Sequence, residues 1–112
     1  MQLTTTFRGM NRSETASATT TLERTTARLD RLLERPVPLR AVVEGGSPEY
    51  NVTLSMAVEG EDLVAQSGGH ELALAITTAC ERLRSQLVRM RRRRQTSRNR
   101  AAAGASDETE NT

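Results

Sequence analysis

The sequence predicts an α+β domain with the element order β-α-β-β-β-α, in which a four-stranded sheet carries two helices on one face. Three observations lead to this fold class. Apolar and polar residues alternate in four short segments, which is the period of a half-buried strand. In two longer segments apolar residues recur every three or four positions, as in an amphipathic helix. The outward strand positions are polar, so only one face of the sheet is expected to be covered, and both helices must pack there.

The first half of the chain predicts a strand, a helix and a second strand. Residues 2–8 alternate and are rich in β-formers. Residues 13–34 carry a helical apolar face that Asn11 or Ser13 can cap. Residues 37–44 alternate again. Because a helix joins the two strands, we expect them to pair in parallel.

The second half predicts a meander of hairpins and a long helix. Residues 50–58 show the clearest alternation in the chain, and residues 63–67 a shorter one, with Gly60 in the turn between them. Gly68-Gly69 is expected to break the fourth strand and to open the last helix, which the apolar spacing predicts for residues 70–100.

The apolar faces of these elements predict the core. Its expected members are Leu22, Leu29, Leu32, Leu39, Val52, Leu54, Ile76, Leu83 and Leu87. Cys80 lies on the buried face of the last helix and is interpreted as a small core hydrophobe. A single cysteine cannot form an internal disulfide, the N-terminus lacks the apolar run of a secretory signal, and no stretch is long enough to span a bilayer. We therefore expect a cytoplasmic protein.

Charge is distributed unevenly along the chain. Residues 1–81 carry seven arginines and eleven acids, residues 82–100 carry nine arginines and no acid, and residues 101–112 carry three acids and no base. Ordinary solvated helix faces mix both signs. A cluster of one sign on one helix is instead the expected footprint of a protein that binds a polyphosphate. Every basic residue is arginine, whose planar group can bind a phosphate through two hydrogen bonds.

A helical wheel places these arginines beside the apolar stripe. Arg82, Arg89 and Arg93 lie on one flank, and Arg84 and Arg91 lie on the other. The candidate nucleic-acid-binding residues are Arg82, Arg84, Gln86, Arg89, Arg91, Arg92, Arg93 and Arg94.

Arg94 marks the expected end of the domain. It falls where the next core residue should be, so by this turn the helix is expected to have left the body of the protein. We therefore divide the chain into a domain of residues 1–94 and a disordered tail of residues 95–112, which is basic and then acidic.

Several segments resemble one family. The opening Met-Gln-Leu with alternating threonines, the helix ending Leu29-Asp30-Arg31-Leu32, and the stretch Ala75-Ile76 followed by Arg82-Leu83-Arg84-Ser85-Gln86-Leu87, Arg89 and Arg91 are similar to those of the ribosome hibernation-promoting factors, also described as ribosome-associated inhibitors or sigma-54 modulation proteins. The chain departs from that pattern where the family has a tyrosine and a second acid, since Ala73 and Thr77 stand there. It looks like a short form, without the dimerising C-terminal domain of long members.

The resemblance implies a fold like that of double-stranded-RNA-binding domains. It also implies a site in the mRNA and tRNA channel of the small ribosomal subunit, where the protein would contact 16S rRNA and neighbouring ribosomal proteins. There it would inhibit translation and preserve idle bacterial ribosomes under stress. Arginine contacts to RNA shape and phosphates agree with that role.

Other classes of function are weighed against this one. His70 is the only histidine, and no nucleophile motif, phosphate loop or metal-ligand spacing accompanies it, so we expect no enzyme, cofactor or metal. The alternatives that stay open are another RNA- or DNA-binding module that uses the same helix, and an adaptor for an acidic protein partner. The isolated protein is expected to be a monomer, with no membrane or small-molecule partner.

Overall fold

The computed structural model describes residues 2–46 and 48–107, with side chains described as far as residue 99. The element order and the fold class are those predicted. The elements are β1 (Gln2–Arg8), α1 (Arg12–Asp30), β2 (Pro38–Glu44), β3 (Tyr50–Val58), β4 (Glu61–Gly69) and α2 (Leu72–Asp107).

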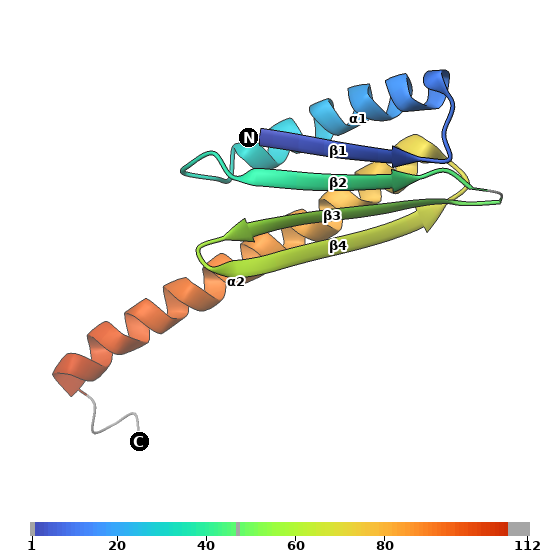
Figure 1. The fold of residues 1–112 in the computed structure, drawn as a ribbon. Helices are drawn as coiled ribbons and strands as arrows, with labels where there is room; N and C mark the ends of the chain where they lie inside the picture. Colours follow the sequence, from blue (N-terminus) through green and yellow to red (C-terminus); the bar gives the residue numbers. More distant parts are fainter. Residues whose placement is uncertain (1, 47, 108–112) are drawn as a thin grey trace.

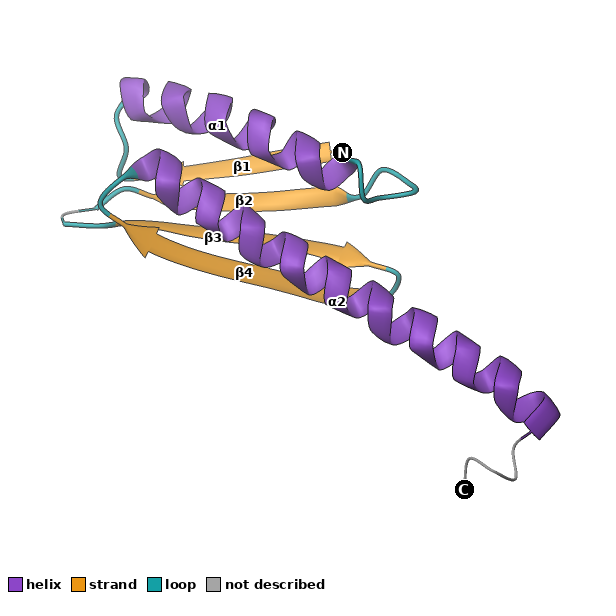
Figure 2. Ribbon diagram, turned by 180° about the vertical axis from the view of Figure 1, so that it is seen from behind, coloured by secondary structure: helices purple, strands orange, loops and turns teal. Residues whose placement is uncertain are grey.

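The strands form one mixed sheet in the order β1-β2-β3-β4. β1 and β2 are parallel, with Thr5 beside Ala41, whereas the pairs β2–β3 and β3–β4 are antiparallel. Ala41 in turn faces Leu54, and Leu54 faces Ala65, so one row of mainly apolar side chains crosses the sheet. Both helices cover this side of the sheet (Figures 1 and 2). The arrangement confirms the predicted two-layer α+β architecture.

The opposite face of the sheet is covered by none of the described elements. A row of Thr6, Val42, Thr53 and Gln66 runs across it, and each of these side chains is exposed or half-buried. Mixed polar rows of this kind are what a sheet with one solvated face requires.

α1 begins with a capping box. Asn11 accepts a hydrogen bond from the main-chain N–H of Glu14 at 2.8 Å, and the Glu14 carboxylate accepts one from the N–H of Asn11 at 3.0 Å. The many threonines of α1 are poor helix formers, but their hydroxyls are satisfied within the helix. Each donates to the carbonyl oxygen four residues earlier: Thr15, Thr19, Thr20, Thr21, Thr25 and Thr26.

The predicted end of the first helix is wrong. α1 ends at Asp30 instead of residue 34, because the chain tightens there: the N–H of Leu32 donates to Leu29 O at 2.9 Å and that of Leu33 to Asp30 O at 3.1 Å. Leu32 consequently packs at the rim of the core and is only half-buried, whereas the other predicted core residues are fully buried.

The glycines at the end of β4 do not break the strand. Gly68 lies beside Asn51 in the ladder, and a Cβ atom added at Gly68 would lie 3.2 Å from Asn51 Oδ1 and 3.3 Å from Tyr50 O. Glycine therefore permits a close approach of β3 and β4 here, and β4 extends to Gly69.

α2 packs along the sheet and against α1. Its buried face consists of Ala75, Ile76, Ala79, Cys80, Leu83, Leu87 and Met90. Figure 1 shows the helix running past the end of the sheet. The helix continues to Asp107, so residues 95–107 of the segment that we expected to be disordered are helical. Residues 108–112 lie outside the described part of the chain. The division into a domain and a separate tail at residue 94 stays a prediction.

Candidate nucleic-acid interface

The flank of α2 that faces β4 is bound to the edge of the sheet. Arg82 Nη1 donates a hydrogen bond to the carbonyl oxygen of Gln66 at 2.5 Å, and Gln86 Nε2 donates one to that of Val64 at 2.6 Å. β4 is an edge strand, so these carbonyl groups have no strand partner beyond it. Both side chains predicted to contact nucleic acid thus also complete the outer edge of the sheet.

Arg93 and Arg94 are paired with the turn between β3 and β4. Arg93 Nη2 lies 2.8 Å from Glu61 Oε1. Arg94 Nη2 donates to the carbonyl oxygen of Glu59 at 2.7 Å, and its guanidinium nitrogens lie 3.4 Å from the carboxylates of Glu59 and Glu61. The hydrogen bonds to Arg93, together with those to Arg94 and the charges of both, lower the pKa of Glu61. The acid therefore stays ionised near neutral pH.

The expectation that α2 has left the body at Arg94 is wrong. Arg94 is the 23rd residue of α2, which rises by about 1.5 Å per residue, whereas the nine-residue strand β4 rises by about 3.3 Å per residue. The strand is therefore nearly as long as this part of the helix. The β3–β4 turn therefore lies beside Arg94. The residue does fall on the inward stripe, as the wheel indicates, but it meets carboxylates and a carbonyl instead of apolar side chains.

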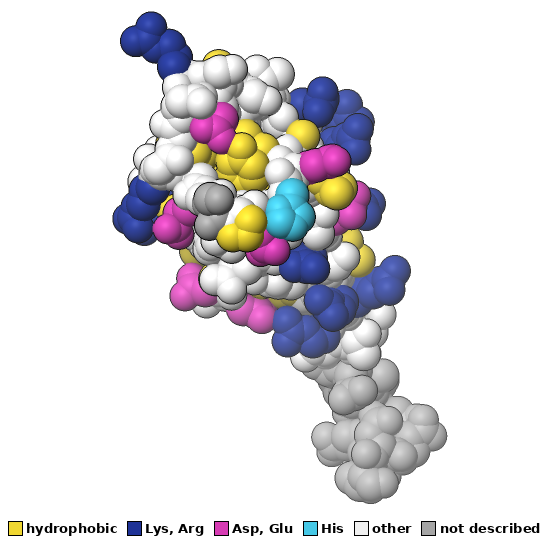
Figure 3. Space-filling view, turned by 90° about the vertical axis from the view of Figure 1, so that its right-hand side faces the viewer, with side chains coloured by type: hydrophobic (Ala, Val, Ile, Leu, Met, Phe, Trp, Pro, Cys, Tyr) yellow, Lys and Arg dark blue, Asp and Glu magenta, His cyan; other side chains and the backbone are white. Residues whose placement is uncertain are grey.

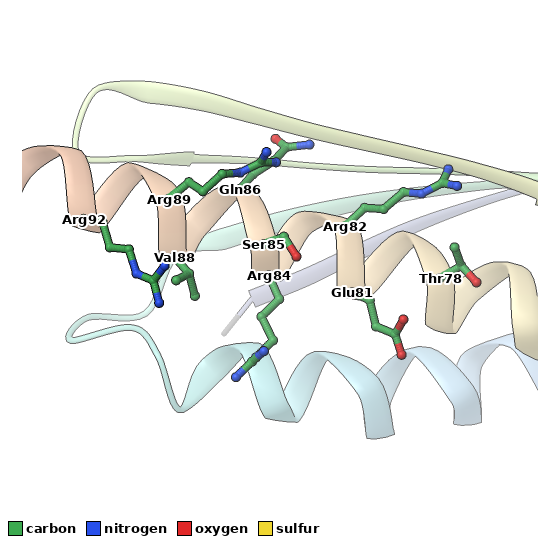
Figure 4. A pocket seen from close by; sticks show the side chains of 9 residues that line it. All are labelled: Thr78, Glu81, Arg82, Arg84, Ser85, Gln86, Val88, Arg89 and Arg92. Carbon is green, nitrogen blue, oxygen red and sulfur yellow. The ribbon is translucent and has the colours of Figure 1, made fainter.

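Four of the predicted arginines have no hydrogen-bond or ion-pair partner among the described residues. Arg84, Arg89 and Arg92 are exposed, and Arg91 is half-buried. Figure 4 shows Arg89 on the same side of α2 as Arg82, whereas Arg84 points toward α1. These arginines reach both flanks and the outer side of the helix, so their charge is available to an external anion.

Two arginines at the end of α1, one in its last turn and one at its C-cap, extend the basic surface and are not among the predicted residues. Arg28 and Arg31 line a groove between the helices together with Arg84, and Thr25 and Cys80 lie at its floor. Cys80 Sγ lies 3.1 Å from Thr25 Oγ1. In the sequence, the i, i+3 spacing of these two arginines could have indicated that they share one helix face. That this face lies next to α2 becomes clear only when the packing of the helices is known.

Several of the arginines gather in one part of the surface. The space-filling view shows one group of dark blue side chains over the lower part of the body, where α2 leaves it, and further dark blue side chains elsewhere on this face (Figure 3). Together with the groove, the unpaired set comprises Arg28, Arg31, Arg84, Arg89, Arg91 and Arg92. Glu81 lies beside Arg84, Arg89 and Arg92, and Glu34 and Glu59 line the same hollow as Arg91. This surface carries a net positive charge and fits a polyanion.

The aromatic side chains do not offer a stacking platform. Phe7 packs against the core, and the Tyr50 hydroxyl donates a hydrogen bond to the Glu14 carboxylate. This hydrogen bond lowers the pKa of Glu14 and raises that of Tyr50. Recognition by stacked bases is therefore not supported by the fold.

His70, the one histidine of the sequence, contacts the main chain of a neighbouring loop. His70 Nδ1 lies 2.9 Å from the carbonyl oxygen of Pro48, which ties the end of β4 to the loop before β3. Within residues 2–46 and 48–107, His, Cys, Asp and Glu form no group of three or more that could hold a metal ion. No helix in these ranges combines the length and apolar character needed to cross a bilayer.

Two solved structures share the arrangement of sheet and helices. The crystal structure of the Thermus thermophilus Protein Y N-terminal domain superposes with a TM-score of 0.69 at 22% identity, over 80% of this chain and 99% of that one. The chain has the Protein Y fold. A ribosomal subunit interface protein from Coxiella burnetii gives a TM-score of 0.67 at 14% identity, over 81% of this chain and 98% of that one.

The resemblance noted in the sequence is thus confirmed at the level of the fold. No family model and no curated protein matches the chain. At 22% and 14% identity the likeness does not extend to individual side chains, so the roles of the arginines depend on their own geometry.

Proposed function

We propose that this protein binds the small ribosomal subunit in the cytoplasm, in the channel that holds mRNA and tRNA, and thereby inhibits translation. Bound there, it would stabilise inactive ribosomes under stress without catalysing a reaction. The fold supports this proposal, because one protein that shares it is a ribosomal subunit interface protein. The family resemblance of the last helix supports the location.

The observation that carries the proposal is the set of unpaired arginines on α2. Arg84, Arg89, Arg91 and Arg92 have no partner in the described part of the chain, although Arg82, Arg93 and Arg94 do. Unpaired guanidinium groups on two flanks of one helix can hold several phosphates at once. Ribosomal RNA, which is read largely through shape and phosphate contacts, is a partner of this chemistry.

The test is sedimentation of a cell lysate through a sucrose gradient, with the protein followed by immunoblot. We expect the protein to migrate with small subunits and to return to the top of the gradient after RNase treatment. A protein that stays at the top in both gradients would contradict ribosome binding. Association that survives complete RNase digestion would instead indicate an acidic protein partner.

A further inference from the structure

The turn between β3 and β4 has an unusual first residue. Glu59 has φ +52° and Gly60 has φ +81°, so this two-residue hairpin loop has both central residues in the left-handed region. Asn-Gly is the favoured pair in such a loop, because most other side chains disfavour positive φ. The requirements of the turn therefore explain Gly60 but not the glutamate before it.

The interactions of the turn with α2 do account for its acids. The Glu59 carbonyl and carboxylate both bind Arg94, and the Glu61 carboxylate binds Arg93 and Arg94. In the free protein two guanidinium groups are thus paired with two carboxylates. Carboxylate and phosphate oxygens are equivalent acceptors for arginine, which binds either through paired N–H groups.

We propose that Glu61, together with Glu59, competes with the polyanion for Arg93 and Arg94: the two acids hold these arginines in place of phosphates and set how strongly the basic surface binds RNA. This inference rests on the proposed function, because it concerns the same surface. The arginines that lack partners bind the polyanion first. Arg93 and Arg94 then exchange their carboxylates for phosphates, so the turn lowers the affinity that the full arginine run would otherwise provide.

The exchange is feasible because the pairs lie at the surface. The side chains of Arg93 and Glu61 are 67% and 36% exposed, and those of Arg94 and Glu59 are 37% and 43% exposed. Exposed ion pairs are weak. A phosphate track that also releases its condensed counterions can therefore displace them.

The decisive variant is Glu61→Gln, which keeps the size of the side chain and removes its charge. Its matched control is Asp62→Asn, because Asp62 is the next residue, is exposed, and makes no ion pair with an arginine of the described chain. Both variants remove one negative charge. Only Glu61→Gln releases Arg93 and loosens the hold on Arg94.

Binding is measured by fluorescence anisotropy with an RNA duplex of about 16 base pairs, the span of one double-stranded-RNA-binding domain, and by co-sedimentation with purified small subunits. We expect Glu61→Gln to tighten binding by about two- to fivefold, the range that an exposed ion pair corresponds to. Asp62→Asn should change binding much less. In the Arg93→Ala, Arg94→Ala background, Glu61→Gln should have no more effect than Asp62→Asn.

Equal effects of the two single variants would overturn the inference, as would a Glu61→Gln gain that persists without Arg93 and Arg94. The two probes separate this inference from the proposed function. If the wild-type protein binds subunits and Glu61→Gln binds them no more tightly, the proposed function is retained and the competition by Glu61 is rejected. Wild-type protein that binds the duplex but not the subunit removes the proposed function, and the duplex series still decides the inference. Binding to neither probe removes both.

Discussion

Arg82 binds the carbonyl oxygen of Gln66 through a 2.5 Å hydrogen bond, whereas Arg89, on the same flank of α2, has no partner among the described residues. Two arginines on one flank of a helix therefore have different surroundings, and we expect them to have different roles. Arg82→Ala should lower the free energy of unfolding by about 0.5–1.5 kcal/mol, because the carbonyl oxygen of Gln66 loses its hydrogen-bond donor. Arg89→Ala should change it by less than about 0.5 kcal/mol and weaken RNA binding. Urea denaturation and filter binding of both variants measure the difference, and identical profiles would contradict it.

Leu83 lies on the buried face of α2 and is 0% exposed. Leu83→Ala should destabilise the fold by about 2–5 kcal/mol, because less apolar surface is buried and a cavity is left behind. The matched control is Leu74→Ala on the same helix, because Leu74 is 61% exposed. Its effect should stay within about 0.5 kcal/mol in the same denaturation experiment. A similar destabilisation in both variants would show that α2 packs on another face.

Periodicity is sufficient to predict the layers of this fold, but not the interactions that end its elements. The apolar stripe of α2 identifies Leu83 and Leu87 correctly, since burial follows directly from the helical repeat. The same pattern wrongly places Leu32 in the core, because it continues past the point where α1 tightens and ends. Which arginines are free depends on where the β3–β4 turn lies in space, and no local pattern contains that information. The surroundings of Arg94 are therefore mispredicted.

Gly60 should be required for the β3–β4 turn. Its φ is +81° and an added Cβ would meet no atom within 4 Å, so the effect of Gly60→Ala is purely conformational. We expect a decrease of about 1–2 kcal/mol in the free energy of unfolding. Gly69→Ala is the control, because an added Cβ there also meets nothing within 4 Å and its φ is not in the left-handed region. Thermal denaturation showing equal changes for the two variants would exclude the left-handed turn.

Cys80 should make stability sensitive to alkaline pH. Burial raises the pKa of its thiol, although the hydrogen bond to Thr25 acts in the opposite direction. A raised pKa in the folded state means that the unfolded chain ionises first. The contribution of the thiol to stability is therefore complete below its unfolded pKa of about 8.5 and decreases as the pH rises through the folded value. Cys80→Ala should remove this alkaline decrease in urea denaturation at several pH values. An unchanged pH profile would contradict the assignment.

The affinity of the protein for purified small ribosomal subunits, titrated at several salt concentrations, tests the central claim most directly. Arg84, Arg89, Arg91 and Arg92 are replaced together by glutamine, which removes their charge and leaves the core untouched. We predict steep salt dependence for the wild-type protein. In the variant we predict a slope of log affinity against log salt that is flatter by about 0.7 to 0.9 for each phosphate that the protein no longer binds. Salt-independent binding, or a variant that binds like the wild type, would contradict the claim that these arginines hold ribosomal RNA.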